Sequence, residues 1–146
     1  ITNPKNVGII LRSAVAAGIS GLIYPRRNSP RLGPLVIQSS AGAALKAPII
    51  WCDNIAEALI EYKSNGFTII GLDPSSKDSL LDMIPTKRAI YILGAESDGI
   101  STDSSPYLTK RVSIPMSNFV ESLNVAVAGS ILSYFIKYNL EGRLKL

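Results

Sequence analysis

The stretch Ile114-Pro-Met-Ser-Asn-Phe-Val-Glu-Ser-Leu-Asn-Val-Ala-Val-Ala128 decides the fold of this chain. It follows a strand-like run over residues 111–114 that ends at a proline, and Ser122 through Asn124 then open an apolar helix. Free backbone N–H groups gather at a helix start, so this loop is suited to hold a small polar ligand. The order strand, loop, helix is typical of α/β proteins and predicts a ligand site at the loop.

The same alternation runs through the rest of the chain. Helices are predicted over residues 7–17, 34–44, 54–66 and from 122 onward, with a short helical piece near 80–83. Strands are predicted over residues 21–24, 48–52, 67–72, 89–93 and 111–114. In the first helix, Asn6 is expected as the N-terminal cap and Gly18 as the C-terminal stop. The alternation predicts an α/β fold with a mostly parallel sheet and helices on both faces.

The composition limits the chemistry that this chain can perform. The chain has no histidine, which excludes Ser–His–Asp and Cys–His nucleophilic machinery. Because it also has a single cysteine, Cys52, a zinc site is disfavoured and no metal is expected. No apolar run reaches the length of a membrane span, and the polar start of the chain lacks a secretory signal. We therefore expect a cytoplasmic protein.

The length of 146 residues predicts one domain over residues 1–146. The sequence has no initiator methionine and begins at a turn, so we expect this domain to be the C-terminal part of a longer protein. In the final helix, apolar residues at helical spacing indicate a core or interface face rather than a cofactor site: Ala128, Ile131, Leu132, Phe135 and Ile136.

Ligands of parallel sheets bind beyond the carboxyl ends of the strands, which places three loops at the predicted site. These are the loop after Leu93, the loop after Ile114, and residues 3–6. Gly94-Ala-Glu-Ser-Asp-Gly99 can form a tight loop whose N–H groups touch a ligand, although an ordinary turn explains it equally well when taken alone. Ser122 and Asn124 could likewise be simple helix caps.

Two groups of arginines need partners. Arg12 has apolar neighbours on its predicted helix, so it requires a carboxylate, a phosphate or a route to solvent. From spacing alone, an ion pair with Glu96 or Glu121 is the simpler interpretation. Three further arginines follow the strand at 21–24, namely Arg26, Arg27 and Arg31. With a net charge of +4, they fit either a solvated loop or contacts with a polyanion.

Three motifs in order give the chain a family resemblance. N-P-K-N-V-G-I-I-L-R begins at residue 3, G-A-E-S-D-G-I at residue 94, and I-P-M-x-x-x-V-E-S-L-N-V-A-V-A at residue 114. Together they resemble the SpoU family of the SPOUT superfamily, whose members are S-adenosylmethionine-dependent RNA methyltransferases that usually act on ribose 2′-hydroxyls. The stretch Ser39-Ser-Ala-Gly-Ala43 is also similar to a family motif. Lys5, Ser97 and Asp98 depart from the usual pattern, so the resemblance does not specify the substrate.

The resemblance implies a C-terminal trefoil knot, a homodimer formed through the first and last helices, and tRNA or rRNA as substrate. It implies an adenosine pocket lined, largely by backbone, at Gly94, Ile114, Met116 and Leu123. It implies a functional polar set of Arg12, Asn6, Glu96, Ser122 and Asn124. It also favours Arg26, Arg27 and Arg31 as contacts to the RNA backbone.

Arg12 is the candidate for direct participation in methyl transfer. An arginine side chain keeps its proton at working pH, so an electrostatic role toward the developing alkoxide is favoured over general-base catalysis. Two other interpretations stay open. One is a non-catalytic knotted RNA-binding module, and the other is a flavodoxin-like nucleotide-binding domain, which the missing phosphate loop disfavours.

Overall fold

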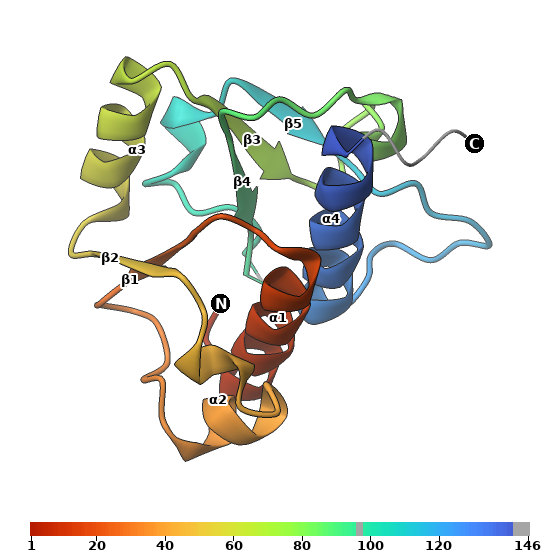
Figure 1. The fold of residues 1–146 in the computed structure, drawn as a ribbon. Helices are drawn as coiled ribbons and strands as arrows, with labels where there is room; N and C mark the ends of the chain where they lie inside the picture. Colours follow the sequence, from red (N-terminus) through yellow and green to blue (C-terminus); the bar gives the residue numbers. More distant parts are fainter. Residues whose placement is uncertain (96–97, 142–146) are drawn as a thin grey trace. The chain divides into compact units, whose positions relative to one another are not determined.

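The computed structural model describes residues 1–95 and 98–141 and forms two compact units (Figure 1). The first unit comprises Ile1–Asn54 together with the chain from Val125 onward, and the second comprises Ile55–Asn124. All strand pairs in both units are parallel, which confirms the predicted α/β class.

Over its described residues, the first unit contains a two-stranded sheet and three α-helices. Its elements are α1 (Pro4–Ala17), β1 (Leu22–Pro25), α2 (Pro34–Ser39), the 3-10 turn η1 (Ala43–Leu45), β2 (Ile49–Cys52) and α4 (Val125–Leu140). Strand β1 pairs with β2 from Leu22 opposite Ile49 to Pro25 opposite Cys52. Helix α1 packs against both α2 and α4. One core cluster joins α1, β1, α2 and η1 through Val7, Leu11, Tyr24, Val36 and Ala44.

Helix α1 begins three residues earlier than predicted. Asn3 is the cap, since its Oδ1 accepts a hydrogen bond of 2.9 Å from the Lys5 N–H, and Pro4 occupies the first turn where its missing N–H costs nothing. The prediction that Asn6 caps this helix is therefore wrong: Asn6 lies inside the first turn and is buried. The predicted stop is confirmed, because Gly18 has a left-handed φ of 73° and its N–H bonds to the carbonyls of the last turn.

Helix α2 is shorter than predicted. It begins at Pro34 as expected but ends at Ser39, and the chain turns through Ala41 and Gly42, both with positive φ. The buried side chain of Ser40 explains the break. Its Oγ donates to the Ile37 carbonyl and accepts from the Ala44 N–H, bonds that compete with a continuing helix.

The second unit is built on a three-stranded sheet of order β4-β3-β5. Its elements are α3 (Ile55–Ser64), β3 (Thr68–Leu72), the 3-10 turn η2 (Leu80–Asp82), β4 (Ala89–Leu93), the 3-10 turn η3 (Ser105–Tyr107) and β5 (Lys110–Val112). The central strand β3 is the most buried, with Ile69 and Ile70 almost inaccessible to solvent. The prediction for β4 is confirmed residue by residue, whereas β5 begins one residue earlier and ends two residues earlier than predicted.

The register of this sheet brings its loops to one edge. Leu72 lies opposite both Leu93 of β4 and Val112 of β5. Because all three strands run in the same direction, the segments that follow them leave from the same edge. One strand separates β4 from β5, so their ends are about 10 Å apart. A ligand of nucleoside size can contact both.

Candidate functional site

The loop after β4 closes tightly on itself. Ala95 and Gly99 exchange two backbone hydrogen bonds, of 2.7 and 3.0 Å, and Gly99 has a left-handed φ of 65°. A Cβ added to Gly94 would lie only 2.4 Å from the carbonyl carbon of Gly99. Glycine is therefore the residue that fits at position 94. Glu96 lies outside the described residues.

The loop after β5 carries the remaining predicted cofactor contacts. The side chains of Ile114, Met116 and Leu123 are half-buried, and α4 begins only at Val125. Ser122 and Asn124 thus precede the helix and are exposed. None of the hydrogen bonds found among the described residues uses the backbone N–H of Met116 or Leu123. These groups are donors available to a ligand at the carboxyl edge of the sheet.

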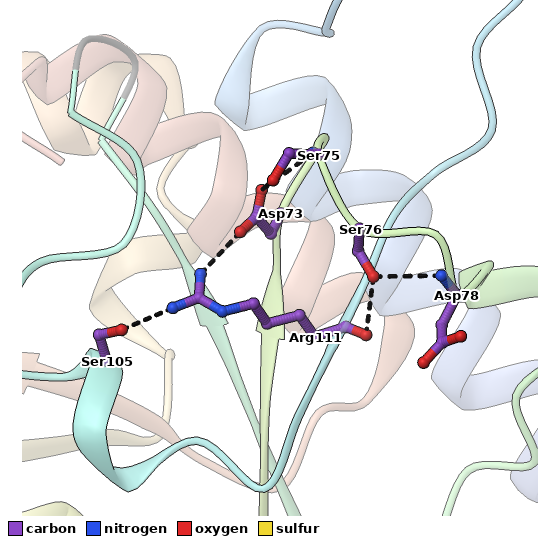
Figure 2. Close-up of polar contacts among 6 residues, drawn as sticks. All are labelled: Asp73, Ser75, Ser76, Asp78, Ser105 and Arg111. Carbon is purple, nitrogen blue, oxygen red and sulfur yellow. Dashed lines mark hydrogen bonds and ion pairs between the residues drawn. The ribbon is translucent and has the colours of Figure 1, made fainter.

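The loop after β3 is fixed to β5 by a network that the sequence did not reveal (Figure 2). The Arg111 guanidinium donates to Asp73 Oδ2 at 2.6 Å and to Ser105 Oγ at 2.5 Å. Ser75 donates to Asp73 Oδ1 through its N–H and its hydroxyl, and Ser76 donates to the Arg111 carbonyl. The network joins β5, η3 and residues 73–78, so it holds one side of the ligand edge in place.

Asp73 makes this network sensitive to acid. The hydrogen bonds from Ser75, and then the bond and charge of Arg111, hold the pKa of Asp73 below its usual value. A depressed pKa contributes stability that is complete above the unfolded-state value near 3.9 and is lost as the pH falls through the folded-state pKa.

We therefore expect Asp73→Asn to flatten the acid limb of the stability profile. The measurement is the free energy of unfolding from urea titrations at pH 7 and at pH 3. Between pH 7 and pH 3, the parent chain should lose more of this free energy than the variant does. The same substitution at the exposed Asp103 is the control. An Asp73→Asn variant with the parent's acid limb would contradict the assignment.

Two residues of the predicted polar set belong to the first unit. Arg12 is exposed on α1, while Asn6 is buried and has a polar partner. Since Ser122 and Asn124 belong to the second unit, the grouping of the four stays a prediction. The simpler interpretation, an ion pair of Arg12 with Glu96 or Glu121, is untested for the same reason, because Glu121 is in the second unit and Glu96 is not described.

Two of the three loop arginines, Arg26 and Arg31, line a hollow of about 240 Å³ in the first unit, and Arg27 is not part of its lining. Arg26 forms an ion pair of 3.3 Å with Asp53 and lies over the ring of Trp51. Arg27 and Arg31 are exposed and form no ion pair with the described residues. Sequence interpretation missed Trp51, because the run Pro48–Cys52 reads as an ordinary apolar strand. The signal available was the proximity of the lone tryptophan to Arg26 across a predicted parallel pair.

The described part of the chain contains no group of three or more His, Cys, Asp or Glu side chains arranged to hold a metal ion. Over the same residues, no helix has the length and apolar character needed to cross a membrane.

Comparison with known proteins supplies the family. Residues 1–134 match the model of the SpoU rRNA Methylase family. The chain belongs to this family. A Staphylococcus aureus protein described as a TrmH family tRNA/rRNA methyltransferase is 34% identical to this SpoU-family chain over 134 residues, which are 92% of the chain and 54% of the relative. The chain thus spans about half the length of the curated relatives that it matches.

Solved structures agree with this membership. The SpoU methyltransferase AviRb from Streptomyces viridochromogenes, solved in complex with the cofactor AdoMet, superposes with a TM-score of 0.86 at 26% identity, covering 97% of this chain and 58% of that one. A structure described as an RNA 2′-O ribose methyltransferase gives a TM-score of 0.83 at 25% identity, covering 99% and 54%. The family resemblance seen in the three sequence motifs is therefore confirmed.

Proposed function

We propose that residues 1–146 form one catalytic domain that transfers a methyl group from S-adenosylmethionine to a ribose 2′-hydroxyl of tRNA or rRNA. The observation that carries the proposal is the ligand edge of the second unit. There Gly94 and the segment from Ile114 to Leu123 leave the same side of a parallel sheet. The family membership and the AdoMet complex of AviRb support the choice of ligand.

The residues at this edge fit an adenosyl group. Met116 and Leu123 offer backbone donors that no described residue uses, and both side chains, like that of Ile114, are half-buried apolar groups beside them. An adenine ring needs this combination of apolar contact and a few fixed polar groups. S-adenosylmethionine supplies the methyl group when bound. The family fold further implies that this segment threads a trefoil knot, which forms part of the proposal.

Arg12 is proposed as the residue that acts on the RNA. Its exposed guanidinium is a fixed positive charge on the surface of α1, with a planar fork of donors that matches a phosphate and an adjacent oxygen. Placed beside the reacting ribose, it would stabilise negative charge as the 2′-oxygen attacks. Asn6, Glu96, Ser122 and Asn124 complete the proposed polar set.

A homodimer is proposed through α1 and α4. Helix α4 exposes an apolar and aromatic stripe at positions that share one helical face: Val127, Ile131, Tyr134 and Tyr138. Within this face, Tyr134 and Tyr138 stack with ring centroids 5.9 Å apart. Exposed apolar stripes of this kind mark interaction surfaces. A sedimentation-equilibrium mass equal to one chain would contradict the dimer. As an RNA-modifying enzyme, the protein is also proposed to be cytoplasmic.

The test is calorimetric titration of this chain with S-adenosylmethionine and S-adenosylhomocysteine. We expect saturable binding of one ligand per chain, and at least tenfold weaker binding by Asn124→Ala, because Asn124 belongs to the proposed polar set and immediately precedes α4. Lys87→Ala, an exposed change away from the loops, is the matched control. Unchanged affinity in Asn124→Ala would remove this residue from the site. No binding by the folded chain would favour a non-catalytic RNA-binding module, and bound flavin a flavodoxin-like function.

A further inference from the structure

The hollow beside Trp51 is lined in part by an exposed indole ring. It is lined by residues 24–26 and 29–32 and by Trp51 of the neighbouring strand. Trp51 leaves 43% of its surface exposed, although an indole is among the side chains that gain most from burial. Pro25 and Cys52 end the parallel pair directly beside it. The indole therefore stands at the end of the two-stranded sheet, next to the arginine-bearing loop.

The structure around the indole is held firmly. Tyr24 is buried and meets Trp51 edge to face, with ring centroids 5.4 Å apart. Its hydroxyl donates to the Pro30 carbonyl at 2.7 Å, which ties the loop to the sheet. The Arg26 N–H bonds to the Cys52 carbonyl at 2.8 Å, and its guanidinium lies 5.1 Å from the Trp51 ring centroid. A planar surface held in this way loses little conformational entropy when a second ring stacks on it.

The charge around the hollow is positive. Asp53 offsets part of the charge of Arg26, but its own side chain is 83% exposed, so the pair is screened by solvent. Arg31 lines the hollow, and Arg27 directly follows the lining residue Arg26 in the chain; neither has an acidic partner among the described residues. An exposed indole beside unpaired arginines is the combination that binds single-stranded nucleic acid, since aromatic rings stack on bases and guanidinium groups contact phosphates.

We propose that Trp51 is a stacking site for one unpaired base of the RNA, with the adjacent phosphates on Arg27 and Arg31. The inference rests on the proposed function, which supplies RNA as the partner, and it adds the form in which the RNA binds. Base pairs in a helix bury their faces against one another, so only a base in a loop, bulge or single strand can stack on the indole. The site selects for unpaired RNA rather than for a sequence.

The chain contains one tryptophan, so its intrinsic fluorescence reports on this site directly. We expect a single-stranded hexaadenylate RNA to quench the fluorescence saturably, and an abasic oligomer of equal charge to bind at least fivefold more weakly with little quenching. Trp51→Leu, followed by fluorescence anisotropy of labelled hexaadenylate, should lose about tenfold or more in affinity, in line with removal of one stacked base. Trp51→Phe should recover part of that loss.

Two controls separate stacking from charge and from the proposed function. Arg27→Gln with Arg31→Gln should weaken binding and lower its salt dependence while saturating RNA still quenches Trp51. Trp51→Leu should bind S-adenosylmethionine like the parent, because Trp51 is remote in sequence from the loops of the ligand edge. Equal binding of hexaadenylate and the abasic oligomer, or equal quenching by duplex RNA or polyglutamate, would overturn the stacking site. The calorimetric result would still stand on its own.

Discussion

Replacing Arg12 by lysine should lower the rate of methyl transfer to RNA at least a hundredfold, about as severely as replacing it by alanine. Lysine keeps the charge but presents a compact ammonium group in place of a planar fork, so it cannot grip a phosphate and an adjacent oxygen together. Loss of one fixed donor to a developing oxyanion typically costs a factor of 10² to 10³. Because Arg12 is exposed on α1, neither change removes buried packing.

The measurement is single-turnover incorporation of labelled methyl groups into unmodified tRNA and rRNA at saturating cofactor. Arg88→Lys is a matched control, since Arg88 is also exposed and, among the described residues, its Nη1 donates only to the Asn65 carbonyl at 3.4 Å. Cofactor affinity of the Arg12 variants, measured by calorimetry, should equal that of the parent. Near-normal turnover by Arg12→Lys would exclude the bidentate role.

Gly94→Ala should abolish tight cofactor binding. The added methyl group would lie 2.4 Å from the carbonyl carbon of Gly99, 2.7 Å from its oxygen and 2.7 Å from the Ile100 nitrogen. These are backbone atoms, so the loop has to open, and overpacking of this kind costs about 1–3 kcal/mol. We expect at least a tenfold loss in affinity for S-adenosylmethionine together with a lower urea midpoint.

Gly99→Ala is the control for Gly94→Ala, because both changes fall in one loop. A Cβ at Gly99 would meet no described atom within 4 Å, so the cost there comes from the left-handed φ of 65° alone, about 1–2 kcal/mol. The pair separates crowding of the loop from general destabilisation. Parent-like affinity in Gly94→Ala would show that this loop does not bound the cofactor site.

Much of the architecture could be predicted because its signals are local. Continuous apolar runs identified β3 and β4 to within a residue, and Pro34 and Gly18 marked helix ends through their own backbone preferences. The errors arose where side chains bond to nearby backbone. Asn3 caps α1 in place of Asn6, and the hydrogen bonds of Ser40 end α2 earlier than predicted. Such competition depends on local geometry that residue type alone does not determine.

Some features of the candidate site could be predicted from the sequence, and others could not. The edge of the sheet at which a ligand would bind could be predicted, because strand ends in a parallel sheet share an edge. The assignment of Gly94, Ile114, Met116 and Leu123 to an adenosine pocket comes from the family resemblance and stays a prediction. The Asp73–Arg111–Ser105 network could not be predicted, because it joins segments whose proximity follows from the strand order β4-β3-β5. Trp51 was hidden by its strand context, since an apolar run does not reveal which of its faces is left uncovered.

The strand order also bears on how this domain is made. Strand β3 receives β5 on one side, yet Ile70 pairs with Lys110, forty residues further along the chain. During synthesis from the N-terminus, one edge of β3 therefore stays unpaired until β5 has left the ribosome. An unpaired edge is a template for association with other chains, and pairings distant in sequence form slowly. Premature termination between β4 and β5 would leave that edge of β3 permanently unpaired. Strand β5 is therefore the strand that protects the nascent domain from aggregation.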